Sequence, residues 1–470
     1  MNNFDLLDSQ KVKHIHFIGI GGSSMSGLAE ILLNMGYKIS GSDQNLTIKT
    51  HKLQEKGIPI CEGHSENNIK NPDLVVYTAA ISEDNPELVK ARSMGIPTIE
   101  RATLLGLIMK KYPFSIGVSG THGKTSTTSM IASIMLKAGF DPGIHIGGEL
   151  GIIGGGTRIG NGDYFITEAC EYVDSFLKLH PYLAVILNIE ADHLDYFKDI
   201  NQIKESFHKF ALLVPNNGYV IGCSDNKNVL DVLEGLQCNV ITYGLNKENA
   251  QWSAKNINFD SNGCASYILT YKGDELAAIK LNVPGLHNVS NSIAAAAACY
   301  TLGCNLDAIK NGLYEFKGAK KRFEVKGTAR GVTVIDDYAH HPSEIKATLL
   351  AAKNTASKRI WCVFQPHTYT RSKALLNEFA VAFKDAHAVI VTDIYAAREK
   401  DTGKIHASTI AEKIKSQNTN AIYIPDFKDV ALYLLDNASE GDVVITMGAG
   451  DVVKAGELFI EYAGKNENAI

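Results

Sequence analysis

Residues 114–139, FSIGVSGTHGKTSTTSMIASIMLKAG, predict a buried strand, a glycine turn and a helix in direct succession. The turn ends like a phosphate-binding loop, but G-x-x-x-x-G-K-[ST] requires a glycine at position 118, which is Val118. Gly117 lies one position too early. Backbone N–H groups of a glycine turn that opens a helix nevertheless form a concave anion site. The stretch therefore favours ATP bound with Mg²⁺ at the edge of an α/β sheet.

Polar side chains supply the rest of that site. Lys124 can reach β- and γ-phosphates, and the Thr125 hydroxyl can bind Mg²⁺. Glu168 follows the strand-like run YFITEA, and His193 follows LAVILNI, so both are predicted at carboxyl ends of strands, where ligands gather. The predicted metal ligands are Thr125, Glu168 and His193. The second run continues into further polar residues, Asn188, Glu190 and Asp192.

An earlier glycine turn, GIGGSSMSG at 19–27, also lies between a strand and a helix, and Asp43 closes the next strand. This placement predicts a nucleotide diphosphate at the helix N-terminus. The strict dinucleotide pattern G-x-G-x-x-G fails because Ser24 occupies the third glycine position. A nicotinamide cofactor and a tight turn without ligand both remain alternatives at this point.

Strand-like and helix-like runs alternate through most of the chain, which predicts an α/β fold with mostly parallel sheets. Around 251–283 the pattern changes to alternating strands joined by the YKGDE turn, which predicts a hairpin. A chain of 470 residues is too long for one core and should form about three domains. We expect a Rossmann-like domain at 1–110, a central P-loop ATPase-like domain at 111–325 and a Rossmann-like domain at 326–470.

Composition narrows the class of protein. Hydrophobic residues make up 45% and charged residues 21%, and 46 basic against 51 acidic residues leave a net charge of −5. No basic block points to nucleic acid. The eight cysteines form no C-x-x-C pair, so neither zinc nor a disulfide framework is expected. No apolar run could span a membrane, and residues 1–14 lack a secretory pattern, so we expect a cytoplasmic protein.

Five segments in order resemble the Mur ligases, the ATP-dependent amino-acid ligases of peptidoglycan precursor synthesis. They are HFIGIGGSSMSGLAEILLNMGYKISGSD, GTHGKTS, NIEADHLDYF, DDYAHHPSE and FQPHTYTR, and the likeness runs from about residue 14 to 456. The loop G-T-x-G-K-[TS] is that family's own form, which accounts for the missing first glycine. The resemblance implies an N-terminal UDP-sugar domain, a central ATPase domain and a C-terminal domain that closes over both.

The activity implied is that of the member joining L-alanine to the lactyl carboxylate of UDP-N-acetylmuramate through an acyl phosphate. The substrates would be UDP-N-acetylmuramate and L-alanine, with ATP and Mg²⁺, and neither nucleic acid nor membrane as partner. A monomer or weak homodimer is expected. A recycling ligase that attaches a tripeptide to the same UDP-sugar is the alternative, although GIGG in the first turn favours the alanine enzyme. A nicotinamide-dependent dehydrogenase or a non-catalytic ATP switch would leave these motifs unexplained.

The resemblance also assigns residues. For catalysis it implies Lys124, His193, His341 and Arg371. For ATP it implies Gly120, Thr121, Gly123, Lys124, Thr125, Ser126, His287, Asn288, Arg322, Asp336 and Asp337. For the UDP-sugar it implies Gly19, Gly21, Gly22, Ser23, Asp43 and His122, and for the amino acid and carboxylate Tyr338, His340, His341, His367 and Arg371.

Some positions depart from the family pattern. Ser23 and Ser24 replace the more usual pair that ends in glycine, Cys170 stands in an acid's place before Glu171, and Thr368 stands where some members carry arginine. Several relatives use a carbamylated lysine near a second metal. Lys204 and Lys209 follow His193 in the sequence, and whether either is modified stays open.

Overall fold

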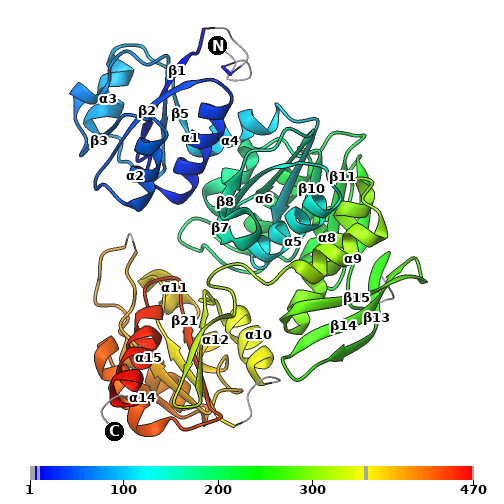
Figure 1. Cartoon of the computed structure of the whole chain (residues 1–470), viewed down its shortest axis with the longest axis vertical. Helices are drawn as coiled ribbons and strands as arrows, with labels where there is room; N and C mark the ends of the chain where they lie inside the picture. The colour runs from blue at the N-terminus through cyan, green and yellow to red at the C-terminus, as the bar shows by residue number, and fades with distance from the viewer. Residues whose placement is uncertain are drawn as a thin grey trace. The chain divides into compact units, whose positions relative to one another are not determined.

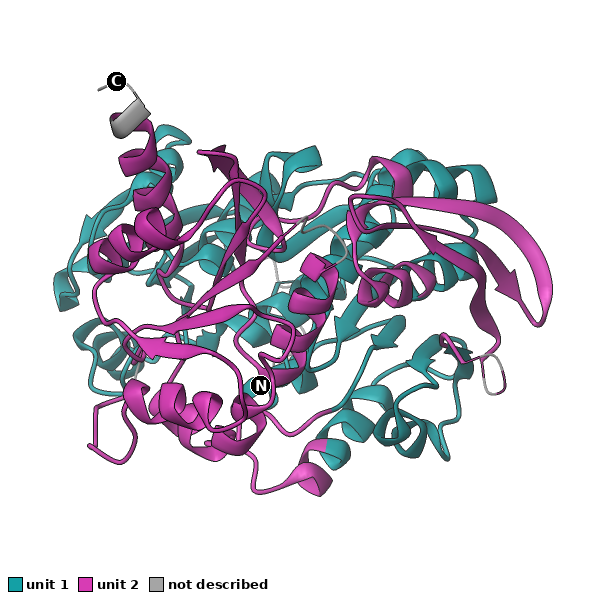
Figure 2. Ribbon diagram, turned by 90° about the horizontal axis from the view of Figure 1, so that it is seen from below, with its two compact units in different colours: residues 1–189, 204–243, 294–312 teal, residues 190–203, 244–293, 313–470 magenta. Residues whose placement is uncertain are grey.

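The computed structural model describes residues 6–7, 11–246, 248, 250–353, 358–397 and 399–467. The chain divides into two compact units (Figure 2). Unit 1 comprises residues 1–189, 204–243 and 294–312, and unit 2 comprises 190–203, 244–293 and 313–470. Among the described helices, none combines the length and apolar character needed to cross a membrane. The expectation that no secretory leader is present rests on residues 1–14, several of which lie outside the described residues.

The N-terminal sheet belongs to unit 1 and has the parallel strand order β3-β2-β1-β4-β5 (Figure 1). Its strands are β1 (His14–Ile18), β2 (Lys38–Asp43), β3 (Ile60–Glu62), β4 (Leu74–Tyr77) and β5 (Thr98–Glu100). The intervening helices are α1 (Ser23–Asn34), α2 (Ile48–Glu55), the 3₁₀ turn η2 (Glu66–Asn68), α3 (Pro86–Ser93) and α4 (Arg101–Met109). This order is that of the first five strands of a Rossmann fold, and it places the Gly19 turn at the carboxyl end of the central strand β1.

The second sheet of unit 1 has the order β12-β11-β10-β6-β9-β7-β8, and every pair for which a register is defined is parallel except β7 with β8. Its strands are β6 (Phe114–Ser119), β7 (Gly143–Leu150), β8 (Gly155–Arg158), β9 (Tyr164–Glu168), β10 (Leu183–Ile186), β11 (Tyr219–Cys223) and β12 (Asn239–Tyr243). Accompanying helices are α5 (Lys124–Lys137), η3 (Gly151–Ile153), η4 (Tyr172–Lys178), α6 (Ile200–Ala211), α7 (Lys227–Leu233), α8 (Leu286–Thr301) and α9 (Leu306–Glu315). The predicted strand, turn and helix at 114–139 are confirmed as β6 and α5.

The alanine run in α8 allows close helix packing. Residues 294–298 are all alanine and have no exposed surface. The Cys299 thiol lies 3.8 Å from the carbonyl oxygen of Ile131 in α5. Small side chains thus let α8 lie directly on the helix that follows the phosphate loop.

The hairpin expected near 251–283 is present in unit 2. Strands β13 (Trp252–Phe259), β14 (Cys264–Tyr271) and β15 (Asp274–Pro284) pair antiparallel in the order β15-β14-β13. The β14–β15 connection is the two-residue turn Lys272–Gly273, with positive φ at both positions, as a tight hairpin requires.

The C-terminal sheet of unit 2 has the order β16-β17-β21-β18-β19-β20, parallel except for β16 against β17. Its strands are β16 (Glu324–Ala329), β17 (Val332–Asp337), β18 (Ile360–Phe364), β19 (Ala388–Val391), β20 (Ala421–Tyr423) and β21 (Val443–Met447). Its helices are α10 (Pro342–Lys353), α11 (Tyr369–Ala374), α12 (Leu376–Ala380), α13 (Ala407–Lys415), α14 (Phe427–Asn437) and α15 (Val453–Glu467).

Strand β18 explains why this sheet is covered on both faces. All five of its residues are buried. Cys362 and Phe364 belong to one apolar cluster with residues of α10, α12 and α13, whereas Trp361 and Val363 belong to another with α14 and α15. This continuous apolar run is therefore a central strand between two helical layers. The domain boundaries near residues 110 and 325 stay predictions.

Candidate active-site residues

The phosphate loop lies in unit 1 between the end of β6 at Ser119 and the start of α5 at Lys124. Gly120 has a φ of +138°, and a Cβ there would lie 2.9 Å from the Leu187 Cβ, so only glycine fits. Gly123 caps α5 in the left-handed conformation without a side-chain cap. No acidic residue occupies the first turn of α5. The loop therefore presents a positive helix end.

Asn188 fixes the shape of this loop. Its side-chain oxygen accepts the His122 backbone N–H at 2.8 Å, and its amide donates to the His122 carbonyl at 3.0 Å. The Asn188 carbonyl also accepts the Thr121 N–H at 3.0 Å. Sequence reasoning noted Asn188 but gave it no role, because its partner is 66 residues away. The signal available was its position just after β10, beside β6 in the sheet.

Lys124 points back into its own loop. Its ammonium donates to the Gly120 and Thr121 carbonyls and to both Glu171 oxygens, at 3.1 and 3.0 Å. Burial opposes the charged form of Lys124, but the Glu171 carboxylate outweighs it and the lysine pKa is raised. Glu171 is 4% exposed and Lys124 16%. Lys124 is thus a fully charged cation that Glu171 already neutralises.

Thr125 and Glu168 are brought together as predicted. The Thr125 hydroxyl donates to a Glu168 oxygen at 3.0 Å, and the Gly147 N–H donates to the same oxygen at 2.9 Å. A hydroxyl and a carboxylate are oxygen donors of the kind Mg²⁺ takes beside nucleotide phosphates, so this pair fits such an ion. His193, the third predicted ligand, belongs to unit 2. The three-residue metal set therefore stays a prediction.

The first glycine turn is tied to the end of β2. The N–H groups of Gly19 and Ile20 both donate to the Ser42 carbonyl, at 2.8 and 3.0 Å. The Asp43 carboxylate accepts the Gly21 N–H at 2.8 Å. Asp43 consequently shapes the turn in addition to any contact with a ligand, and the Gly21 N–H is already committed. At the next positions Gly22 precedes α1, and the Ser23 hydroxyl accepts from Lys49 at 2.6 Å.

In unit 2, Arg371 forms a bidentate pair with Asp192. The guanidinium donates to the Asp192 carboxylate at 2.9, 3.0 and 3.3 Å, and Nη1 lies 3.1 Å from the His367 ring. Burial alone would raise the pKa of Asp192, but the Arg371 charge lowers it well below its usual range. His193 follows with a positive φ of 53°, and its N–H donates to Asp192. Two predicted residues, Arg371 and His193, thus contact Asp192, and His367 is linked to it through Arg371. Sequence reasoning left Asp192 without a role.

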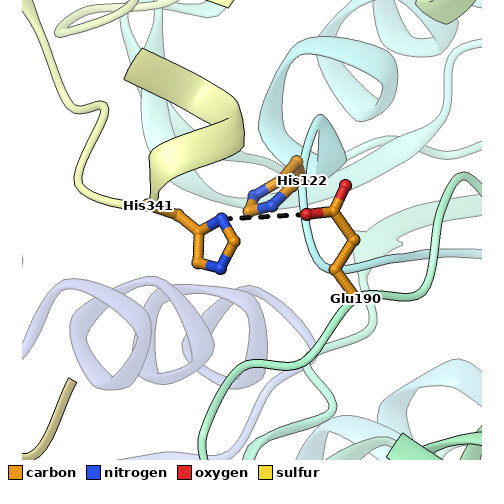
Figure 3. A group of neighbouring side chains, drawn as sticks. All are labelled: His122, Glu190 and His341. Carbon is orange, nitrogen blue, oxygen red and sulfur yellow. Dashed lines mark ion pairs between the residues drawn. The ribbon is translucent and has the colours of Figure 1, made fainter. Parts of the chain in front are cut away.

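His341 lies beside Glu190, with Nδ1 and a carboxylate oxygen 3.8 Å apart (Figure 3). The same carboxylate accepts the Ser343 hydroxyl. His122, also drawn in Figure 3, lies on the phosphate loop of unit 1. His341 opens α10, and its carbonyl accepts the Ile345 N–H at 3.0 Å, so the helix start positions the imidazole.

Tyr338, His340 and Arg322 form a neighbouring group. The Arg322 guanidinium lies 5.1 Å from the centre of the Tyr338 ring, and the His340 ring is 5.3 Å from the same ring. The His340 and His341 N–H groups donate to Glu344, which caps the segment. Burial lowers the pKa of His340 to about 4, so its imidazole is neutral at pH 7. Burial does the same for His367, whose pKa is also about 4.

The remaining predicted residues of unit 2 are bonded within the fold. Asp336 accepts the Thr446 hydroxyl at 2.7 Å, and Asp337 accepts the N–H groups of Phe323 and Ala339 at 2.8 and 2.7 Å. Burial raises the pKa of Asp337 to about 6. His287 is exposed in the first turn of α8. Asn288 beside it donates to the Pro284 carbonyl at 2.8 Å.

The departures from the family pattern have local partners. Thr368 caps α11 by accepting the Arg371 N–H at 3.4 Å, so it orients the arginine instead of adding a second cation. Lys204 pairs with Asp231, and Lys209 with Glu205 at 2.7 Å. The remaining predicted loop residue, Ser126, is partly exposed in the first turn of α5.

A glycine loop between a parallel strand and a helix, with a lysine and a threonine–carboxylate pair, defines an α/β protein that binds nucleotide phosphate. Family models agree on a narrower class. The N-terminal region matches "Mur ligase family, catalytic domain" at 14–113, the centre "Mur ligase middle domain" at 118–299, and the rest "Mur ligase, glutamate ligase domain" at 321–450. The chain belongs to the Mur ligase family.

Relatives match over the whole length. UDP-N-acetylmuramate–L-alanine ligase of Acetivibrio thermocellus is 62% identical over 98% of both chains, and that of Caldanaerobacter subterraneus is 52% identical over 97% of this chain and 99% of its own. Among solved structures, the UDP-N-acetylmuramate–alanine ligase of Thermotoga maritima has a TM-score of 0.80 at 29% identity, and the match covers 96% of this chain and 99% of the other. The murein peptide ligase of Psychrobacter arcticus has a TM-score of 0.71 at 25% identity, and the match covers 96% of this chain and 98% of the other.

Proposed function

We propose that this chain joins L-alanine to the lactyl carboxylate of UDP-N-acetylmuramate with hydrolysis of ATP, the first amino-acid addition of peptidoglycan precursor synthesis. The observation that carries the proposal is the loop at 120–125, where Lys124 and Thr125 open α5 and the Thr125 hydroxyl contacts Glu168 at the end of β9. The relatives that match over the whole chain bear the name of this activity. The murein peptide ligase of Psychrobacter arcticus shares the fold with a lower TM-score.

The chemistry follows from the weak reactivity of a carboxylate. A lactyl oxygen attacks the γ-phosphorus of ATP and ADP departs, which leaves an acyl phosphate. The L-alanine amine then attacks the acyl carbon, phosphate leaves with its electron pair, and the amine loses one proton. The first step brings two anions together and the second releases phosphate as an anion, so cations must offset the charge.

Unit 1 supplies the groups for ATP. We assign the γ-phosphate to Lys124, which would exchange Glu171 for phosphate oxygens, and the other phosphates to the N–H groups of the 120–126 loop. Thr125 and Glu168 would hold Mg²⁺, with His193 as the further predicted ligand. A bound Mg²⁺ would supply charge neutralisation at the phosphates.

Unit 2 supplies candidate groups for the amino acid, the carboxylate and the adenosine. Arg371 is a fixed cation beside His367, and His340 is neutral at pH 7, so it can accept or donate a hydrogen bond without a charge. We assign Tyr338, His340, His341, His367 and Arg371 to the amino acid and the reacting carboxylate. His287, Asn288, Arg322, Asp336 and Asp337 are assigned to the adenosine end.

The UDP-sugar is assigned to the first turn, with Gly19, Gly21, Gly22, Ser23 and Asp43, and His122 is assigned to its lactyl end. We place the enzyme in the cytoplasm, where ATP and the UDP-sugar are made. A monomer or weak homodimer stays the expected state. Neither nucleic acid nor membrane enters the proposal.

The test is direct. Purified protein is incubated with ATP, Mg²⁺ and UDP-N-acetylmuramate, and phosphate release is followed with L-alanine, with tripeptide and without an amine. A UDP-muramoyl-alanine mass that requires L-alanine, and that Lys124→Ala abolishes, would support the proposal. Turnover with tripeptide alone would identify a recycling ligase, and no turnover with either amine would refute ligation.

A further inference from the structure

Arg101, the first residue of α4, is a partly buried guanidinium that forms no ion pair with any residue that the structure describes. Its one hydrogen bond among the described residues runs from Nη1 to the Ser24 hydroxyl at 3.2 Å. No described carboxylate lies within ion-pair distance of it. Burial lowers the pKa of Arg101, against the raising effects of Cys170 and Glu100. A desolvated cation of this kind is costly unless an anion joins it.

A chain of hydrogen bonds holds the Ser24 end of this contact. The Ser24 hydroxyl lies 2.8 Å from Nε2 of His145, and Nδ1 of His145 lies 3.1 Å from the Thr157 hydroxyl. Burial lowers the pKa of His145 to about 3, so the ring is neutral at pH 7. Ser24 can then donate its one hydroxyl hydrogen to Nε2 while accepting from Arg101. Arg101 keeps its remaining N–H groups for another acceptor.

Helix α1, which bears Ser24, is held closely on the central sheet. A Cβ on Gly27 of α1 would lie 2.1 Å from the Thr157 hydroxyl and 3.1 Å from the His145 ring, so α1 contacts β7 and β8 directly. Arg101 therefore has a fixed place beside the start of α1 rather than a solvated one.

The positive charges at the start of α1 indicate which anion would accept hydrogen bonds from Arg101. The first turn of α1 has no acidic residue and no side-chain cap. Lys49 reaches the Ser23 hydroxyl at 2.6 Å and Arg101 reaches the adjacent Ser24 hydroxyl, so two cations flank one short segment. The diphosphate of a nucleoside diphosphate sugar is a diester that carries two negative charges, one on each phosphate. One cation for each phosphate matches this arrangement.

We propose that Arg101 binds the diphosphate of the UDP-sugar, together with Lys49 across the start of α1, and thereby sets the affinity for that substrate. This inference rests on the proposed function and adds to it a binding residue that no motif identified. Arg101 would act in binding and not in the chemical steps, because its bonding partners belong to α1 and not to the phosphate loop.

The experiment compares Arg101→Ala with the wild type in two assays, calorimetric titration with UDP and with UDP-N-acetylmuramate, and steady-state kinetics. We expect a rise of about 10- to 100-fold in the Kd of both ligands and in the KM for the UDP-sugar, the range for loss of a charge-assisted hydrogen bond. The kcat and the KM values for ATP and L-alanine should change less than about 2-fold. Arg101→Lys should recover part of the affinity, and the Kd of the wild type for UDP should rise more steeply with salt than that of Arg101→Ala.

Arg92→Ala is the matched control, because Arg92 is an exposed arginine of the same domain that already pairs with Glu83. It should leave all constants unchanged. Unchanged UDP affinity in Arg101→Ala would overturn the inference, and a loss confined to UDP-N-acetylmuramate would instead assign Arg101 to the lactyl carboxylate. If kcat fell by the same factor in Arg101→Ala and Arg101→Lys, Arg101 would have a structural role. Failure of the wild type to bind the UDP-sugar would remove the proposed function itself.

Discussion

Replacing Asp192 with asparagine should destabilise unit 2 far more than removing a surface charge. Asp192 and Arg371 are each 9% exposed and are joined by a bidentate pair. Removing one partner of a buried pair leaves an uncompensated charge and costs about 3 to 5 kcal/mol. Because an amide oxygen can keep one of the guanidinium bonds, we expect the lower end, about 3 kcal/mol.

Thermal unfolding followed by circular dichroism measures the effect. For a unit of this size about 1 kcal/mol shifts Tm by about 2 to 4 °C, so Asp192→Asn should lower Tm by about 6 to 12 °C at pH 7. Glu461→Gln, which breaks the exposed i,i+4 pair with Lys465, is the control and should change Tm by less than about 2 °C. The double variant Asp192→Leu/Arg371→Met should recover most of the loss, since no buried charge remains unpaired.

The pH dependence gives a second check on the same pair. Arg371 lowers the pKa of Asp192 in the folded state, so the stabilisation is present above the unfolded pKa of about 4 and is lost as pH falls below it. The Tm difference between wild type and Asp192→Asn should therefore shrink in acid. A difference below about 2 °C at pH 7, or one that does not depend on acid, would show that the pair is solvated and the reasoning wrong.

Three further outcomes can be measured on unit 1 and the C-terminal sheet. Glu171→Gln should lower the free energy of unfolding by about 2 to 3 kcal/mol without nucleotide, because Lys124 loses its carboxylate partner. The loss should be smaller when ATP supplies the missing negative charge to Lys124. An equal loss with and without ATP in thermal-shift assays would contradict this. Asn188→Ala removes both bonds to His122 and should cost about 1 to 3 kcal/mol and raise the KM for ATP, whereas an unchanged KM would mean that the loop keeps its shape alone. The pKa of Asp337 is about 6 in the folded protein, which is higher than in the unfolded chain, so wild-type stability should fall as pH rises from about 4 to 6. Asp337→Asn should flatten that part of the pH profile of the urea midpoint. Equal slopes in the two proteins would exclude Asp337 as the source of the pH dependence.

Short sequence patterns predicted the elements whose structure depends mainly on residues close together in the chain. The β6–loop–α5 unit, the Lys272–Gly273 hairpin and the buried run of β18 each follow from periodicity and turn chemistry within about 25 residues. Strands β7 and β8 were not predicted, because residues 143–158 are rich in glycine and show no alternation. Their pairing is set by neighbouring strands, which a single window cannot contain.

The candidate site shows the same division. Thr125 and Glu168 were predicted as neighbours because the carboxyl ends of parallel strands meet at one edge. The pairing of Asp192 with Arg371 joins residues 179 positions apart, and the contact of Ser24 with Arg101 joins residues 77 apart. Such contacts depend on how helices lie on sheets, so polar residues could be found from the sequence while their partners could not.

Those partners separate the cations of this chain into two kinds. Lys124 and Arg371 each have an internal carboxylate, so an incoming anion must displace Glu171 or Asp192 and gains only the difference between the two pairings. Such sites favour a ligand whose charge is greater than that of one carboxylate, as a terminal phosphate is. Within the described part of the chain Arg101 pairs with no carboxylate, so a singly charged phosphate of a diester would be bound without exchange. The affinity for UDP should therefore depend on Arg101 more strongly than the affinity for ATP depends on any one of the paired cations. Titration of Arg101→Ala with UDP and of Lys124→Ala with ATP would test this comparison.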